Sequence, residues 1–337
     1  MDCKQLAIQA AKGRLLAVEA VYIAASGHPG GSLSAMDILS VLYFHEMKVS
    51  PETAQCPDRD RFVLSKGHCS PALYAMLALK GYFPVEDMKL FRSIHSHYSG
   101  HPDMKNVPGV DMSTGSLGQG ISTAVGMALA GKLDRKNYRV YTLLGDGEIE
   151  EGQTWEAAMA AAKYGLDNLC AVLDVNGLQI DGKTADVMPS EPLDKKYEAF
   201  GWNVISVDGH DYEALIAAFE TARACKGKPT LRRVQERMLC ITDEVPANAF
   251  FATAAGTLAD GLCEQIRQFT AEHPDTVLVA IDTFQMVRGG DTELSYANDY
   301  AEVQKMKKLA DDLSISLLLV HHLRKQGDND PLNKLSG

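Results

Sequence analysis

The stretch LLGDGEIEEG, residues 143–152, places four carboxylates in a short turn directly after an apolar run. Asp146 lies between two glycines, and Glu148, Glu150 and Glu151 follow within the next five positions. Like charges this close together repel one another, and the repulsion falls when a cation binds among them. A metal ion is the simplest explanation for so much negative charge at the end of a strand.

The residues on both sides of this turn predict a β-α-β unit. Apolar runs at residues 138–144 and 168–175 have the length of strands, and an alanine-rich helical segment at 152–165 connects them. Strands joined by a crossover helix are parallel, so both runs end at the same edge of one sheet. Asp146 and Asn176 each follow one of these strands, and open parallel sheets bind ligands at that edge. We therefore expect a ligand between these two side chains.

The residue types at this edge suit a magnesium diphosphate. Mg²⁺ prefers six oxygen ligands and usually takes one or two of them from the protein. Asp146 and Asn176 offer side-chain oxygens, the carbonyl of Leu178 offers a third oxygen, and Gly147 allows a diphosphate to approach the backbone. The alternative is that GDG is only a strand-ending turn and that Asn176-Gly177 is an ordinary hairpin signal.

The composition indicates a soluble globular α/β protein. The chain has 337 residues, of which 46% are hydrophobic and 23% are charged, so we expect two domains or one large domain. A formal charge of -11 argues against a partner with a phosphate backbone, and nucleic acid binding is not expected. The seven cysteines lack CxxC spacing, and the N-terminal residues do not have the pattern of a signal peptide. We expect a cytoplasmic protein that does not bind membranes, because no apolar run approaches the ~18 residues that span a bilayer.

Glycine-rich segments recur between the other predicted elements. A helix is expected over residues 4–25, followed by a flexible loop with the sequence SGHPGGSLS and a second helix capped by Ser34. A strand, a turn at Gly67 and a helix are expected within residues 61–81. Three glycines precede an alanine-rich helix in residues 113–133, whose small side chains permit close packing.

Several of these motifs, in this order, resemble the transketolase family. GDGEIEEG, thirty positions ahead of NGLQIDG, resembles the thiamine-diphosphate motif, and SGHPGGSLS, DRFVLSKGHCSPALYA, SGHP and STGSLGQGISTAVGMALA resemble further transketolase signatures. The resemblance covers about residues 4–230. It implies an α/β fold in which a parallel sheet carries helices on both faces and binds thiamine diphosphate.

The resemblance also implies which residues bind the cofactor. The implied ligands of Mg²⁺, or of Ca²⁺ in its place, are Asp146, Asn176 and the carbonyl of Leu178. The residues implied to contact the diphosphate are His68 and Gly147, with Asp146 and Asn176 beside them, and those implied to contact the aminopyrimidine are Gly115 and Leu117.

Four further residues take catalytic roles from the resemblance. His28 and His101 match histidines that contact sugar hydroxyls and move protons near the reactive carbon, which suits the near-neutral pKa of imidazole. Glu151 and Glu156 match acids that link paired active sites across a dimer interface. The other two glutamates of the opening turn receive no role.

The implied activity is the transfer of a two-carbon ketol unit between sugar phosphates. In the family, the acid that activates the cofactor belongs to a pyrimidine-binding domain, and some bacterial relatives carry that domain on a separate subunit. We therefore expect residues 1–230 to be a diphosphate-binding half, lacking its C-terminal end, that needs a pyrimidine-binding partner in a dimer or heterotetramer. The chain by itself is expected to be inactive.

Residues 231–337 resemble a different family, the RecA-like ATPases of plasmid-replication proteins. An apolar strand ends at Asp282 like a Walker B strand, a helix is expected over 298–313, and a second apolar strand precedes His321, His322 and Arg324. The resemblance implies an incomplete α/β fragment. An apolar strand ending in aspartate is also common in ordinary α/β cores, so this alternative stays open.

A phosphate-binding loop should precede such a strand. The segment GLQIDGKT, residues 177–184, matches the P-loop pattern literally. A working P-loop opens a helix at its Lys-Thr pair, whereas two prolines, Pro189 and Pro192, follow closely here. We therefore predict no functional P-loop in this segment.

Two other functions remain open at this point. The chain could be a RecA-like ATP-binding module of a replication protein with a passive N-terminal part, or a chimera without activity. The sequence does not distinguish a biological fusion near residue 230 from an assembly error, nor does it identify the sugar-phosphate substrates.

Overall fold

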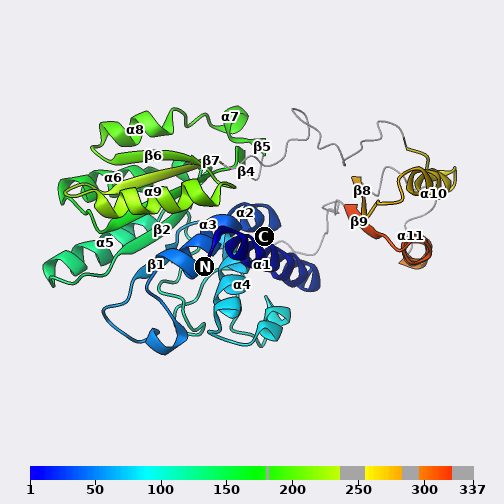
Figure 1. Ribbon diagram of the computed structural model, residues 1–337, viewed down its shortest axis with the longest axis horizontal. Helices are drawn as coiled ribbons and strands as arrows, with labels where there is room; N and C mark the ends of the chain where they lie inside the picture. The colour runs from blue at the N-terminus through cyan, green and yellow to red at the C-terminus, as the bar shows by residue number, and fades with distance from the viewer. Residues whose placement is uncertain (180–181, 236–254, 283–295, 321–337) are drawn as a thin grey trace, which may run out of the picture. The chain divides into compact units, whose positions relative to one another are not determined.

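The computed structural model describes residues 1–179, 182–235, 255–282 and 296–320 (Figure 1). The chain divides into two compact units, Met1–Cys240 and Ile241–Gly337. Among the described residues, no helix is both long enough and apolar enough to cross a membrane.

A parallel sheet forms the centre of the first unit. Within the described residues it has five strands in the order β1-β2-β3-β7-β6, and every neighbouring pair is parallel. The strands are β1 (Arg61–Leu64), β2 (Val140–Gly145), β3 (Leu169–Val175), β6 (Asn203–Asp208) and β7 (Thr230–Gln235). The first six residues of β3 are buried, as expected for a parallel strand that is covered on both faces. The β-α-β unit predicted around the GDG turn is confirmed.

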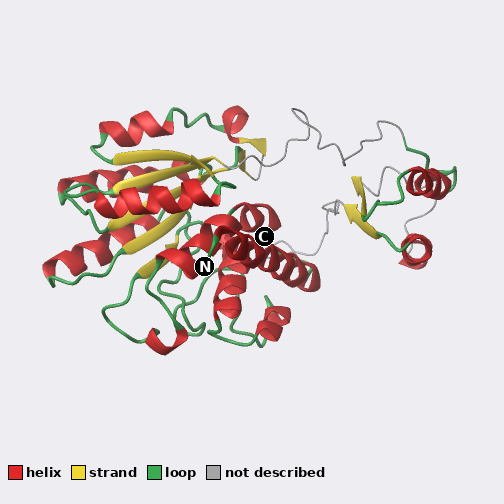
Figure 2. Cartoon of the chain, viewed as in Figure 1, coloured by secondary structure: helices red, strands yellow, loops and turns green. Residues whose placement is uncertain are grey.

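Helices cover both faces of this sheet (Figure 2). Alternate residues of β2 contact different clusters, since Tyr141 and Leu143 belong to one hydrophobic core and Val140 and Leu144 to the other. The helices of the first core are α1 (Cys3–Ala24), α3 (Met36–Val41), α4 (Ser70–Lys80) and α9 (Tyr212–Ala224). Those of the second are α5 (Gly120–Leu133), α6 (Gly152–Lys163) and α8 (Leu193–Ala199). The predicted α/β class with helices on both faces is therefore confirmed.

The segment SGHPGGSLS differs from its prediction. Residues Pro29–Ser34 form the short helix α2, where a flexible loop was expected, because proline is pre-organised for the first turn of a helix. Ser34 does not cap the next helix, whose N-cap is Ala35 without a side-chain hydrogen bond. Instead, the Ser34 hydroxyl donates to Asp174 Oδ2 at 2.6 Å. The Ser34 hydroxyl, which was predicted to cap a helix, is thus hydrogen-bonded to a buried carboxylate on a strand far away in the sequence.

The last strand of the sheet crosses the predicted domain boundary. The boundary expected at residue 230 falls at the first residue of β7, whereas the compact unit continues to Cys240. The change of family resemblance after residue 230 predicted a change of domain there, but Arg232 is completely buried in the first unit. Its guanidinium lies 3.6 Å from the centroid of the Phe219 ring and donates to the carbonyl of Leu215 at 3.1 Å. Both contacts are with α9, and β7 lies between β3 and β6 in the sheet.

The second unit contains the strands predicted for the tail. β8 (Leu278–Asp282) and β9 (Ser316–Val320) pair in parallel, and α10 (Leu262–Glu272) and α11 (Tyr296–Leu313) are its helices among the described residues. Its buried core consists of Leu258, Leu262, Ile266, Ile281, Met306 and Leu309. His321, His322 and Arg324 lie outside the described residues. The likeness to a RecA-type ATPase stays a prediction.

The segment with the P-loop pattern forms a small hairpin. β4 (Leu178–Gln179) pairs antiparallel with β5 (Gly182–Lys183), and a helix of one turn, α7 (Thr184–Val187), follows. A helical turn does therefore begin at the Lys-Thr pair, contrary to expectation. It ends after four residues, whereas a phosphate-binding loop depends on a longer helix whose N–H groups and dipole face the phosphate.

We expect trypsin to leave the bonds after Arg232 and Arg233 intact while the first unit is folded. Both residues lie in a strand that is hydrogen-bonded on both sides, and proteases need an extended, accessible segment. Lys226 is the matched control, because it is exposed and lies outside any helix or strand. Limited digestion with mass spectrometry should show cleavage after Lys226 first. Early fragments ending at Arg232 would contradict the placement of β7.

Candidate functional site

The loops at the carboxyl ends of β1, β2 and β3 meet at one edge of the sheet. His68 follows β1, Asp146 follows β2 and Asn176 follows β3. The structure therefore brings together side chains that the sequence places more than one hundred positions apart. It also brings α2 to this edge, since the rings of His28 and His68 have centroids 5.2 Å apart.

Asp146 connects the turns after β2 and β3. Its Oδ2 accepts a hydrogen bond from the Gly177 N–H at 2.7 Å, and its Oδ1 accepts one from the Gly147 N–H at 3.1 Å. The side chain is almost fully buried, and this burial raises the pKa of Asp146 to about 6. A buried carboxylate with a raised pKa is short of compensating positive charge, so a cation at this position would stabilise its ionised form.

Asn176 and Leu178 lie on either side of Gly177, whose N–H donates to Asp146. The Asn176 Oδ1 accepts from the Leu178 N–H at 2.9 Å, and its amide nitrogen donates to the Ser34 hydroxyl at 3.4 Å. A carboxylate, an amide oxygen and a backbone carbonyl are the hard oxygen donors that Mg²⁺ and Ca²⁺ prefer. Among the described residues, no three His, Cys, Asp or Glu side chains gather as possible metal ligands. The donor set at this edge is of a different kind, with one carboxylate, and it fits a hard divalent cation.

Three histidines gather at the same edge, and all have a lowered pKa. Burial lowers the pKa of His68 to about 4, with smaller contributions from the charge of Lys66 and from the two other histidines. Partial desolvation lowers the pKa of His28, and the charge of Arg92 lowers it further. Burial, His28 and Arg92 lower the pKa of His101. The three rings are therefore neutral at neutral pH and can both donate and accept hydrogen bonds.

A buried ion pair lies next to this edge of the sheet. The Lys66 ammonium contacts the Asp174 carboxylate, and both side chains are almost completely buried. Lys66 Nζ also donates to the carbonyl of Gly31 at 3.1 Å, while Ser34 donates to the same Asp174 oxygen. The pair thus joins α2 to the ends of β1 and β3. Neither residue was predicted from the sequence, although a lysine directly after an apolar strand is an available signal, because a buried lysine needs a partner.

Gly115 lies beside a hollow of the surface. A Cβ atom on Gly115 would approach Cγ of His101 to 3.3 Å, so this loop packs against the histidine. Leu117 is 38% exposed in the same loop. The structure therefore has open space beside Gly115, which was predicted to contact the aminopyrimidine. The hollow has a volume of about 280 Å³ and is lined by Met112, Ser113, Thr114, Gly115, Ser116, Gln119, Gly120 and Thr123.

The predicted interface acids are both exposed. Glu151 is the N-cap residue of α6 and Glu156 lies one turn into that helix. Gly118 leaves room for Glu151, because a Cβ there would lie 2.6 Å from the Glu151 Cβ. Their role across a dimer interface stays a prediction.

Arg92 is a further residue of this region that was not predicted from the sequence. Its guanidinium donates to the Ser26 hydroxyl and packs against Gly100, where a Cβ would lie 2.5 Å from the Arg92 Nε. Ser26 and Gly100 precede His28 and His101 closely in the chain, so one arginine contacts both histidine loops. The sequence offered no signal, because Arg92 lies in none of the recognised motifs.

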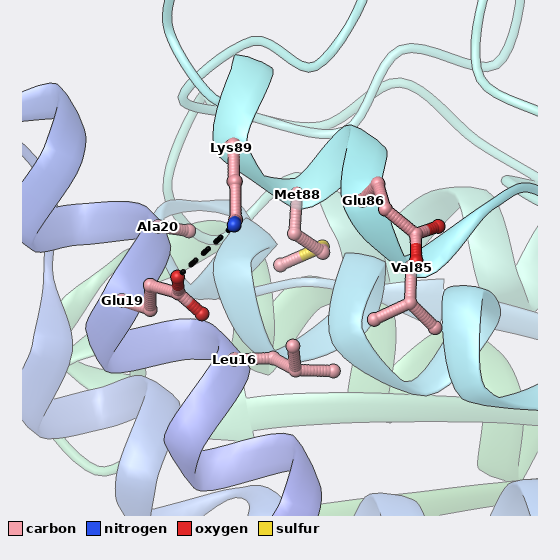
Figure 3. A pocket seen from close by; sticks show the side chains of 7 residues that line it. All are labelled: Leu16, Glu19, Ala20, Val85, Glu86, Met88 and Lys89. Carbon is pink, nitrogen blue, oxygen red and sulfur yellow. Dashed lines mark ion pairs between the residues drawn. The ribbon is translucent and has the colours of Figure 1, made fainter.

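Another hollow lies away from the predicted site residues. It has a volume of about 170 Å³ and lies between α1 and the short helix η4 (Val85–Leu90), as Figure 3 shows. Lys89 Nζ lies 3.7 Å from a carboxylate oxygen of Glu19. The hollow contains none of the residues predicted to bind cofactor or substrate. Its lining is Leu16, Glu19, Ala20, Val85, Glu86, Met88 and Lys89.

Comparison with known proteins identifies the family of the first unit. A protein-family model described as "Transketolase, thiamine diphosphate binding domain" matches residues 4–239. The chain belongs to the transketolase family. Transketolases are thiamine-diphosphate-dependent transferases, so the predicted enzyme class is confirmed.

The curated relatives include separate transketolase subunits. The chain is 50% identical over 218 residues to a 6-deoxy-6-sulfo-D-fructose transketolase subunit of Clostridium sp. strain MSTE9, covering 65% of this chain and 79% of the relative. It is 45% identical over 231 residues to an apulose-4-phosphate transketolase subunit of Phocaeicola vulgatus, covering 68% of this chain and 82% of the relative.

The fold matches solved transketolases. The structure of transketolase from Campylobacter jejuni superposes with a TM-score of 0.66 at 38% identity. The match covers 70% of this chain and 38% of that one, so the chain spans well under half of the solved enzyme.

A second family model, described as "AAA domain", matches residues 202–328. This range is compatible with the RecA-like tail, and it begins beyond the segment with the P-loop pattern. It overlaps the transketolase match between residues 202 and 239.

We expect replacement of Arg92 by glutamine to raise the pKa of both His28 and His101. The arginine charge disfavours protonation of the two rings, so its removal should raise both pKa values, most clearly at low salt. Arg92→Lys is the control, because it retains the charge. The measurement is an NMR titration of the histidine ring protons, and equal titration curves in all three proteins would contradict the arrangement.

Proposed function

We propose that this chain is the diphosphate-binding half of a two-component transketolase, which transfers two-carbon ketol units between sugar phosphates. The observation that carries the proposal is the hydrogen bond from Gly177 to Asp146, which joins the turns after β2 and β3 into one oxygen-rich site. The family match and the relatives named as subunits support it.

The residues present suit thiamine diphosphate and its metal ion. Asp146, Asn176 and the Leu178 carbonyl would hold Mg²⁺ or Ca²⁺, and Gly147 and His68 would face the diphosphate. Gly115 and Leu117 would contact the aminopyrimidine beside the 280 Å³ hollow. When bound, the cofactor supplies the nucleophilic carbon that breaks and forms the bond next to a ketose carbonyl.

The histidines would handle the sugar hydroxyls. A neutral imidazole can accept a proton from one hydroxyl and donate to another, which an imidazolium ion cannot do. Because partial desolvation, with a smaller contribution from the charge of Arg92, holds the pKa of His28 and His101 below its usual value, both rings are neutral at the pH of the cell. His28 and His101 would therefore orient the substrate and pass protons between its oxygens and water.

A partner chain completes the proposed enzyme. Two relatives are named as transketolase subunits, which implies a second chain. We propose that this second chain binds the pyrimidine ring, supplies the activating acid and assembles with the present chain as a dimer or heterotetramer in the cytoplasm. Glu151 and Glu156 are exposed at the N-terminal end of α6 and are available to an interface.

A second candidate function concerns the tail. The match to an AAA domain and the parallel pair β8 and β9, with Asp282 at the end of β8, favour an ATP-binding fragment. In this proposal the N-terminal part is passive, and a chimera without activity is a separate alternative. The cofactor that binds distinguishes the two functions.

We expect Asp146→Ala to abolish magnesium-dependent binding of thiamine diphosphate in the presence of the partner chain. The metal loses its only carboxylate ligand in the proposed site, and the affinity should fall at least about 100-fold. Glu150→Ala is the matched control, because Glu150 is an exposed carboxylate of the same turn. Calorimetry that gives Asp146→Ala the wild-type affinity would refute the metal site.

The pH dependence of metal binding gives a second readout for Asp146. Its pKa is raised to about 6, so protons compete with the metal ion below that pH. Mg²⁺ affinity measured by calorimetry should therefore be constant above about pH 7 and fall as the pH drops through 6. An affinity that stays constant down to pH 5 would argue against Asp146 as the ligand.

We also expect the purified chain alone to show no ketol transfer between xylulose 5-phosphate and ribose 5-phosphate. The proposed activating acid belongs to the partner, so additional cofactor should not restore the reaction. A coupled spectrophotometric assay with and without the partner chain measures this. Turnover by the isolated chain would show that a partner is not needed.

A further inference from the structure

Glu148 is the one carboxylate of the GDGEIEEG turn that is buried without facing the proposed metal site. Only 2% of its surface is exposed. Its Oε1 accepts hydrogen bonds from the Ser65 hydroxyl at 2.5 Å and from the Gly118 N–H at 3.0 Å. Its Oε2 accepts one from the Gly145 N–H at 3.1 Å. The Glu148 carboxylate thus accepts three hydrogen bonds.

The three donors belong to or border three different loops of the site, since Gly145 is the last residue of β2, where the GDG turn begins. Ser65 begins the turn that carries His68, and Gly118 ends the loop that carries Gly115 and Leu117. Gly145 immediately precedes Asp146. Each donor therefore lies within three positions of a residue that is proposed to contact the cofactor at a different part, namely the diphosphate, the aminopyrimidine or the metal ion.

We propose that Glu148 is a positioning residue that fixes the mutual spacing of these three loops and so prepares the site for thiamine diphosphate. The inference rests on the proposed function for the identity of the cofactor, and on the three hydrogen bonds for the spacing. In this proposal Glu148 acts through the loops and not by direct contact with the cofactor or the metal. The family resemblance left two glutamates of this turn without a role, and this proposal gives a role to one of them.

The packing around Glu148 makes the loops depend on one another. A Cβ on Gly120 would lie 2.5 Å from Cα of Ser65, so the first residue of α5, directly after the Gly118 loop, is in close contact with the turn after β1. Gly118 has a φ of +78°, which favours glycine, and it has no room for a side chain beside Glu151. A shift of one loop therefore displaces its neighbour, and a common anchor holds them in register.

The chemistry of the anchor requires a carboxylate. An ionised carboxylate only accepts hydrogen bonds, and its two oxygens have lone pairs for all three donors. A glutamine of the same shape has one oxygen and one NH₂ group, so its NH₂ group would face an N–H or O–H donor. A buried donor without an acceptor is costly, and the loop that carries it should move away.

The test compares Glu148→Gln with Glu150→Gln in the chain without ligands. Glu150 is exposed and its Oε1 accepts from Gln179 at 2.8 Å, so its replacement perturbs the same turn but not the three loops. Hydrogen exchange should become about tenfold faster in the segments around Gly118 and Gly145 in Glu148→Gln only. Exchange in α9 should be unchanged. With the partner chain present, the variant should bind thiamine diphosphate about tenfold more weakly and regain the wild-type turnover number at saturating cofactor.

Several outcomes would overturn the proposal. Unchanged exchange around Gly118 and Gly145 would show that Glu148 does not hold these loops, and faster exchange throughout α9 would show a general stabilising role. Should Glu148→Gln not fold, Ser65→Ala removes a single hydrogen bond, and faster exchange confined to the turn after β1 and the Gly118 loop is then expected. If wild-type protein does not bind thiamine diphosphate, the proposed function fails, but the exchange result still decides the role of Glu148.

Discussion

The parallel pairing of β2 with β3 is the constraint on which the rest of the site depends. In this register Gly145 lies opposite Asp174, and the Asp146 N–H donates to the Asp174 carbonyl at 3.1 Å. The pairing continues one residue beyond the end of β2, and the Asp146 carboxylate accepts a hydrogen bond from the N–H of Gly177. Because β1 joins the same sheet in parallel, its following turn reaches the same edge with His68. Only parallel strands bring three consecutive turns to one side.

Buried charge is the second feature of this edge. Asp146, Glu148, Asp174 and Lys66 are all buried, and desolvation of so many ionisable groups opposes folding unless each is paired or hydrogen-bonded. Lys66 pairs with Asp174, and Glu148 is satisfied by three donors. Burial raises the pKa of both Asp146 and Glu148, and Asp146 accepts only two backbone hydrogen bonds where Glu148 accepts three. Desolvation lowers the pKa of the three neighbouring histidines, and the positive charges of Arg92 and Lys66 lower it further.

The junction between the two units shows why local pattern alone misplaces a boundary. Residues 202–239 match both a transketolase model and an AAA model, and they contain β6, α9 and β7. A strand, a helix and a strand in this order occur in most α/β proteins, so their apolar periodicity does not distinguish one sheet from another. The pairing of β7 with β3 and β6 does distinguish them, and so does the burial of Arg232 against Phe219. These segments belong to the transketolase-like sheet in the structure.

The sequence by itself determined the α/β class, the strands and helices around Asp146 and Asn176, and the family. Each of these depends on periodicity or on motifs within a short stretch of chain. Only the tertiary structure decided that SGHPGGSLS contains a helix, that Ser34 bonds to Asp174 across 140 positions, and that Lys66 is its ionic partner. The same holds for the contacts of Glu148 with Ser65 and Gly118 and for the position of Arg92 between two histidine loops. These interactions join residues far apart in the chain, and a hydrogen bond of this kind depends on how the loops pack, which no local pattern of residues records.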